Sequence, residues 1–219
     1  MTIEEAKQLV CESGKKLLSE GLVTGTWGNV SVKVDEHTMV ITPSGRKYEE
    51  LTPEEMVVVN IFPLEYEGGI KPSSELKLHA EIYKQRKHIT AVIHTHQQHA
   101  SAVAAARREV PPILDDMCQI IGPSVRVADY ALPNTKKIVK NTMKALDGRF
   151  AALLANHGAV CIGRDMEEAF MVAQVLEKTC YAFIEAEFLG GAKGIPRLEA
   201  YIMHQYFILK YSKEKKNNK

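Results

Sequence analysis

Two histidines at alternate positions, His94 and His96, are the residues whose type and spacing most directly suggest chemistry. They follow the apolar run at 89–93, which predicts a short buried strand, and side chains two apart on a strand project to the same face. Both imidazoles can therefore reach one cation, and neutral imidazole nitrogens suit zinc. The same pair also occurs in ordinary core and surface strands, so a metal site needs further ligands.

A third histidine and a carboxylate supply that support. His157 falls in the turn between two predicted strands, where Gly158 allows the backbone to approach a neighbour closely. Three histidines leave one coordination position open, as a catalytic zinc requires, and Glu75 could act there as a fourth ligand or as a base. An acid in the first turn of a helix is also favoured by the helix dipole, and this simpler role for Glu75 stays open. His79, one turn later, is a rival ligand, although a buried, hydrogen-bonded histidine is the preferred interpretation.

Three segments have the residues of anion-binding loops. Glycine-permitted turns, free amide hydrogens and hydroxyl groups are what a phosphate site needs. Each segment taken alone is an ordinary turn, but three of them beside a metal constellation favour a phosphate pocket. The segments are Gly25-Thr26-Trp27-Gly28-Asn29, Thr42-Pro43-Ser44-Gly45 and Ser73-Ser74, the last at the start of a predicted helix that Ser74 is expected to cap.

The periodicity of apolar residues predicts the elements that position these groups. Helices are expected over 3–20, 75–87, 100–107, 135–146 and 166–189, and strands over 30–34, 39–41, 57–62, 89–93, 125–127, 151–155 and 159–162. Strands and helices do not alternate regularly, which favours an α/β fold with a central, largely antiparallel sheet covered by helices. Neither a Walker-type nor a dinucleotide-binding glycine pattern is present.

Length and composition fit one compact domain over residues 1–219, with 212–219 expected to form a flexible tail. The 28 basic and 27 acidic residues leave a formal charge of +1, so neither nucleic acid nor a membrane surface is an expected partner. No leader or membrane-spanning run is recognised, and the four cysteines are scattered without a disulfide framework. These features predict a cytoplasmic protein with reduced thiols.

Five motifs in order make the chain resemble the class II aldolase/adducin family, and within it the L-fuculose-1-phosphate aldolases. They are Gly28-Asn29-Val30-Ser31-Val32, Ile41-Thr42-Pro43-Ser44-Gly45, Pro72-Ser73-Ser74-Glu75, His94-Thr95-His96 and Asn156-His157-Gly158-Ala159. The resemblance implies a nine-stranded sheet between helices and a homotetramer with its active sites at subunit interfaces. It also implies one Zn²⁺ per subunit and a small phosphorylated sugar as substrate.

The resemblance further implies roles for individual residues. His94, His96 and His157 would bind zinc, and Glu75 would ligate the resting metal and then act as the base. The substrate phosphate would be held by Gly28, Asn29, Ser44, Gly45, Ser73 and Ser74. The implied reaction is cleavage of L-fuculose 1-phosphate, or a related deoxyketose 1-phosphate, to dihydroxyacetone phosphate and an aldehyde through an enediolate stabilised by the metal.

Two positions leave the reaction open. Asp116 stands near the place where the fuculose enzymes have a tyrosine that touches the aldehyde half, and pentulose-phosphate epimerases of the family use an aspartate in this region. Tyr211 is the position that best matches the family's C-terminal proton donor, with Tyr206 and Tyr201 as rivals. The alternatives are a pentulose-phosphate 4-epimerase, a decarboxylase or a methylthioribulose-phosphate dehydratase, and, in another class, a non-catalytic adducin-like module.

Overall fold

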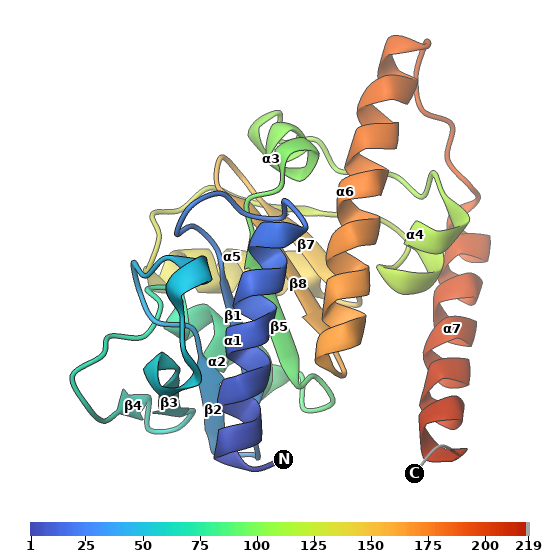
Figure 1. The fold of residues 1–219 in the computed structure, drawn as a ribbon. Helices are drawn as coiled ribbons and strands as arrows, with labels where there is room; N and C mark the ends of the chain where they lie inside the picture. The colour runs from blue at the N-terminus through green and yellow to red at the C-terminus, as the bar shows by residue number, and fades with distance from the viewer. Residues whose placement is uncertain (218–219) are drawn as a thin grey trace.

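The fold is an eight-stranded mixed sheet with helices on both faces (Figure 1). The computed structural model describes the backbone of residues 1–217 and the side chains of residues 1–210. The strands are β1 (Asn29–Lys33), β2 (Thr38–Ile41), β3 (Val57–Asn60), β4 (Glu65–Tyr66), β5 (Ala91–Thr95), β6 (Val127–Ala128), β7 (Ala151–Leu154) and β8 (Gly158–Gly163). The helices are α1 (Ile3–Ser19), α2 (Leu76–Gln85), α3 (Gln98–Ala105), α4 (Asp115–Ile120), α5 (Lys136–Leu146), α6 (Met166–Phe188) and α7 (Arg197–Asn217), with the single 3-10 turns Tyr48–Glu50 and Pro53–Glu55.

The strand order is β4-β3-β2-β1-β5-β8-β7-β6, and only the pairing of β6 with β7 is parallel. The predicted α/β fold with a largely antiparallel sheet is therefore confirmed. The described sheet has eight strands, one fewer than the resemblance implies. Two further pairings, Pro43 with Pro72 and Val110 with Val125, remain isolated bridges. Proline has no amide hydrogen to extend a ladder, and Pro111 directly follows the second bridge.

Helices α1 and α6 cover one face of the sheet, and α2 and α5 lie behind it (Figure 1). Strand β1 is buried on both faces. Val30 and Val32 are buried on one face, and Ser31 on the opposite face contacts His79 of α2. Side chains directly opposite one another in an antiparallel pair share a face. Because Asn29 pairs with His94 and Ser31 with Val92, the face of β5 that carries His94 is the face toward α2.

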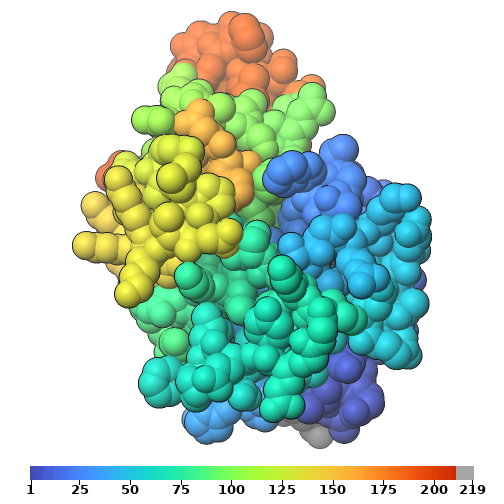
Figure 2. Space-filling model, turned by 90° about the vertical axis from the view of Figure 1, so that its left-hand side faces the viewer, coloured from blue at the N-terminus to red at the C-terminus, as the bar shows by residue number. Residues whose placement is uncertain are grey.

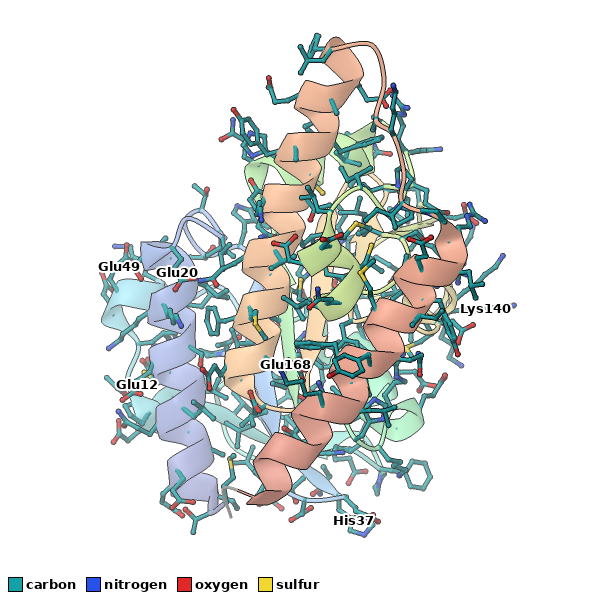
Figure 3. The ribbon with its side chains drawn as sticks, turned by 90° about the vertical axis from the view of Figure 1, so that its right-hand side faces the viewer. Glu12, Glu20, His37, Glu49, Lys140 and Glu168 are labelled. Carbon is teal, nitrogen blue, oxygen red and sulfur yellow. The ribbon has the colours of Figure 1, made fainter. Side chains whose placement is uncertain are left out.

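The two long helices α6 and α7 lie side by side. Glu168 of α6 is buried and pairs with Arg164, whose guanidinium also donates to the carbonyl oxygen of Ile208 in α7. Figure 3 shows Glu168 where α6 and α7 lie side by side. The hydrogen bond to Ile208 is one of the contacts that join the last helix to the rest of the chain. Residues 212–217 continue α7, and the expectation of a flexible tail over 212–219 stays a prediction.

Most of the predicted elements are present with shifted ends. The β-branched run at 57–62 forms β3 only as far as Asn60, and the strand expected at 125–127 is β6 at Val127–Ala128. The predicted cap of α2 is corrected: Glu75 occupies the N-cap, and the Ser73 hydroxyl, not that of Ser74, accepts the Glu75 amide hydrogen at 3.3 Å.

Candidate metal centre and active site

His94 is held rigidly at the centre of the sheet. It is buried, and its Nδ1 lies 2.8 Å from the carbonyl oxygen of Ala159 on the neighbouring strand β8. A carbonyl oxygen only accepts hydrogen bonds, so the Nδ1 atom carries the hydrogen and donates it. The neutral ring then has its lone pair on Nε2, which is the arrangement of a metal-ligating histidine whose other nitrogen is fixed by the protein.

His96 and His157 converge on the same point. The Nε2 atoms of His94 and His96 are 3.0 Å apart, and one ligand nitrogen from each of the three histidines lies within 4.8 Å of the others. Burial lowers the pKa of His157, and burial together with the nearby His157 lowers the pKa of His96 to about 4. The three rings are therefore neutral at pH 7, with lone pairs available to a cation.

The turn between β7 and β8 explains how His157 reaches that point. Asn156 has a left-handed backbone with a φ of 55°, and the His157 amide donates to the Leu154 carbonyl oxygen at 3.0 Å, which closes the turn. A Cβ on Gly158 would lie 2.2 Å from the Thr95 carbonyl oxygen. Only glycine allows this close approach of the turn to the end of β5.

Glu75 brings a carboxylate to the same cavity. It is only 6% exposed, and its Oε2 atom is buried without a hydrogen-bond partner in the protein. Burial raises the pKa of this carboxyl to about 7. A buried, unpaired carboxylate is costly unless it meets a cation or takes up a proton. Three neutral imidazoles and this carboxylate fit a divalent cation by their donor chemistry, and nitrogen-rich sets of this kind are typical of zinc.

The loops predicted to bind phosphate line that cavity, which has a volume of about 240 Å³. The Ser44 amide donates to the Lys71 carbonyl oxygen at 2.9 Å, and the Ser73 amide donates to the Thr42 carbonyl oxygen at 3.0 Å. These bonds hold the second and third loops together. The cavity is lined by Thr26, Trp27, Gly28, Asn29, Pro43, Ser44, Gly45, Ser73, Ser74, Glu75, His94, His96, Pro133 and His157.

These lining residues come from distant parts of the chain. In Figure 2 the blue segment of the first loop, the cyan and teal segments of the next two and the yellow segment before α5 adjoin on one face. Gly28 is required where the first loop meets β5, because its φ is 82° and a Cβ there would lie 2.8 Å from the His94 carbonyl oxygen. The structure thus brings together all three predicted loops, the three histidines and Glu75.

Asp116 is not brought to this cavity. It lies on α4, where its Oδ2 forms an ion pair with Lys178 at 2.5 Å and its Oδ1 accepts the Met117 amide hydrogen. Tyr211 has its backbone in α7, and its side chain lies outside the described residues. The rivals Tyr201 and Tyr206 are exposed on α7. The roles of Asp116 and Tyr211 remain predictions.

His79 is a structural histidine, as preferred from the sequence. Its Nδ1 lies 2.6 Å from the Ser31 hydroxyl, which also contacts the Tyr83 hydroxyl at 2.7 Å. It does not belong to the three-histidine cluster. The lining residue missed from the sequence is Pro133, in the loop between β6 and α5. Nothing in its local pattern distinguishes it from an ordinary loop proline, because only the tertiary fold brings it to the cavity.

An α/β sheet that brings three neutral histidines, a buried carboxylate and the three predicted phosphate loops to one cavity fits a metal-dependent enzyme. Comparison with known families specifies it: the Class II Aldolase and Adducin N-terminal domain model matches residues 8–184, so the chain belongs to the class II aldolase/adducin family.

Three relatives place it within that family. A 5-deoxy-D-ribulose 1-phosphate aldolase of Bacillus thuringiensis serovar kurstaki is 34% identical over 200 residues, covering 91% of this chain and 93% of the relative. An L-ribulose-5-phosphate 4-epimerase of Salmonella paratyphi C is 30% identical over 95% of this chain and 96% of its own. The structure of an L-fuculose 1-phosphate aldolase superposes with a TM-score of 0.88 at 35% identity, covering 93% of this chain and 96% of that one.

Proposed function

We propose that this protein is a zinc-dependent aldolase that cleaves a deoxyketose 1-phosphate to dihydroxyacetone phosphate and an aldehyde. The observation that carries the proposal is the shared cavity: Glu75, with a pKa of about 7 and no protein partner, faces the same space as the three histidines and the phosphate loops. A carboxylate poised near neutral pH can both take and return a proton. An aldol reaction needs a group of this kind next to the substrate carbonyl.

Each group of residues in the cavity has a different role in the proposed reaction. The amides and hydroxyls around Ser44, Gly45 and Ser73 bind the phosphate and set the position of the carbon chain. In the direction of synthesis, Glu75 removes a proton from the carbon that forms the new bond; in cleavage it returns this proton to the dihydroxyacetone phosphate half. A divalent cation held by the histidines would withdraw electrons from the substrate carbonyl and make that carbon-bound proton more acidic. Tyr211 is our candidate to exchange the proton of the aldehyde oxygen.

Two deoxyketose phosphates are the leading substrates. L-Fuculose 1-phosphate and 5-deoxyribulose 1-phosphate share the dihydroxyacetone phosphate half and an aldehyde half that ends in a methyl group. The relative described as a 5-deoxy-D-ribulose 1-phosphate aldolase covers nearly all of this chain, which supports the shorter sugar as the first to test.

The other reactions considered receive less support. Asp116 is paired with Lys178 and does not line the cavity of its own chain, so its position gives the 4-epimerase no added support. A non-catalytic adducin-like module would not need the three histidines and Glu75 to converge. Epimerisation is an outcome of the test below, and decarboxylation and dehydration remain alternatives.

We also propose a cytoplasmic homotetramer. Exposed apolar side chains on α7 give a surface that a second copy could cover, among them Leu198, Ile202 and Leu209. The four cysteines are unpaired and buried, which suits a reducing compartment. Among the described residues no helix has the length and apolar character needed to cross a membrane.

The metal-loaded protein should release dihydroxyacetone phosphate and an equimolar amount of aldehyde from 5-deoxyribulose 1-phosphate or L-fuculose 1-phosphate. Dihydroxyacetone phosphate is measured by coupled reduction with NADH, and the aldehyde by trapping with a hydrazine. A chelator should stop both and added Zn²⁺ should restore them. If neither sugar yields the two products and L-ribulose 5-phosphate is converted to its epimer, the aldolase proposal is wrong and the epimerase replaces it.

A further inference from the structure

Trp27, the sole tryptophan of the chain, lies in an unusual position for so large an apolar side chain. It is 66% exposed and lies in the loop before β1, between Gly25 and Gly28, which both have a positive φ. Its ring centroid lies 5.8 Å from that of His96, with an angle of 39° between the rings. The indole therefore lies beside one of the three histidines at the protein surface and is not needed to fill the core.

The surroundings of Trp27 are otherwise polar. The cavity is lined by hydroxyl, amide, carboxylate and imidazole groups, and Pro43 belongs to a phosphate loop. Trp27, Pro43 and Pro133 are the apolar side chains of the lining, and Trp27 lies beside His96 of the metal site. The indole can thus offer carbon surface to a ligand in a cavity whose lining is mostly polar.

A ketose 1-phosphate bound in this cavity has a fixed order of parts. Its phosphate belongs at the serine loops and its carbonyl at the histidines, so the carbon atoms of the aldehyde half extend beyond the histidines, away from the serine loops. His96 is the histidine beside the indole. The aldehyde half of a deoxyketose ends in a methyl group, which gains free energy by leaving water for apolar surface.

We propose that Trp27 is the specificity-determining residue of this site, and that its indole contacts the methyl end of the aldehyde half. The inference rests on the proposed aldolase function and deepens it. Apolar contact favours the methyl-ended sugar over its hydroxymethyl-ended counterpart, because the hydroxyl group would give up its water without gaining a hydrogen bond from the ring.

A matched pair of pentulose 1-phosphates tests the proposal: one ends in a methyl group and the other in a hydroxymethyl group. The quantity is the ratio of the two kcat/KM values. In Trp27→Ala this ratio should fall about tenfold, the size expected for one lost apolar contact in a specificity pocket. Trp27→Phe keeps an aromatic surface and should restore most of it. Equal zinc content of the three proteins, measured by elemental analysis, ensures that the change does not come from His96.

Fluorescence gives a readout that does not depend on turnover. Trp27 is the only indole, so emission excited at its own wavelength reports this position alone, and Trp27→Phe is the blank. In zinc-loaded Glu75→Gln protein, the methyl-ended pentulose 1-phosphate should shift the emission to shorter wavelength by removing water from the ring. Dihydroxyacetone phosphate, which lacks the aldehyde half, should not produce this shift.

The two proposals fail in different ways. Wild-type cleavage of both pentulose phosphates with an unchanged ratio in Trp27→Ala would overturn the role of Trp27 and leave the aldolase intact. An equal emission shift with dihydroxyacetone phosphate would also overturn it, because the indole would then be at the donor half. A shift confined to the methyl-ended sugar, with no cleavage of either sugar, would support the contact and reject the aldolase.

Discussion

The Nδ1 atom of His94 lies 2.8 Å from the carbonyl oxygen of Ala159, across the pairing of β5 with β8. This one hydrogen bond fixes the tautomer of the central histidine and ties it to the strand that begins directly after His157. His94 is therefore held in place by the sheet itself, whereas His96 follows the end of β5 and His157 lies in the turn between β7 and β8. Their geometry depends on how closely the β7–β8 turn can approach β5.

Gly158 controls that approach. In Gly158→Ala the added Cβ would lie 2.2 Å from the Thr95 carbonyl oxygen, a backbone atom that cannot move without disturbing the sheet. We expect a loss of about 2 to 3 kcal/mol in the free energy of unfolding, the upper range for overpacking, and a zinc affinity at least about tenfold weaker as His157 shifts. Urea unfolding in chelator and a competitive zinc titration measure the two effects.

Gly69→Ala is the matched control, because nothing lies within 4 Å of a Cβ at that position. Its free energy of unfolding should stay within about 0.5 kcal/mol of wild type. Equal behaviour of the two variants would show that the close contact between the turn and β5 does not determine the position of His157.

Glu75→Gln should lose the base while keeping the histidines. The isosteric amide cannot accept a proton, so exchange of a carbon-bound hydrogen of dihydroxyacetone phosphate with deuterated water should slow by about 10² to 10⁴-fold. Proton NMR follows the exchange, and metal content is measured in parallel. Glu65→Gln, an exposed change on β4, should leave the rate unaltered. Exchange at the wild-type rate in zinc-replete Glu75→Gln would remove Glu75 from the role of base.

The Glu75 carboxyl should also make the stability of the metal-free protein depend on pH. Burial raises the folded pKa of Glu75 from 4.5 to about 7. Between these values the unfolded chain releases the proton while the folded chain holds it, so stability falls as the pH rises from 4.5 to 7. Glu75→Gln lacks this loss. Its stability relative to wild type should therefore increase by about 2 kcal/mol between pH 5 and pH 8.

Urea unfolding with a chelator at both pH values measures that difference. Histidines remote from Glu75 affect both proteins alike and cancel in the comparison. A constant difference between the two proteins would mean that the Glu75 carboxyl is not destabilised by its surroundings, and the reason for assigning it the proton transfer would be lost.

Much of the site could be predicted from local sequence because its parts obey local rules. Alternation placed His94 and His96 on one face of a strand, and the pattern of strand, glycine turn and strand placed His157 in the turn. The serine and glycine segments were recognisable as turns, and the presence of three of them beside the histidines favoured a phosphate pocket. Hydrogen bonds such as that from the Ser44 amide to the Lys71 carbonyl oxygen then bring the loops together, as the resemblance to the family implied.

Other features depend on tertiary contacts that no short-range pattern encodes. Pro133 reaches the cavity only because the tertiary fold brings the loop between β6 and α5 to the same space as the predicted phosphate loops. The sequence placed no other partner near Asp116 and left it open as an active-site residue, but in the structure it forms an ion pair with Lys178, 62 residues away. The capping role was assigned to Ser74, whereas Glu75 occupies the N-cap, since a one-residue shift in a helix start cannot be read from composition.

The central claim is that His94, His96 and His157 together hold one metal ion, and zinc stoichiometry tests it most directly. Purified wild type dialysed against limiting free Zn²⁺ should retain one zinc per chain by elemental analysis, and the alanine variant of each of the three histidines should retain far less. His37→Ala is the control, since this side chain lies on the exposed turn between β1 and β2, at the edge of the molecule in Figure 3. Full zinc occupancy in all three ligand variants would contradict the claim.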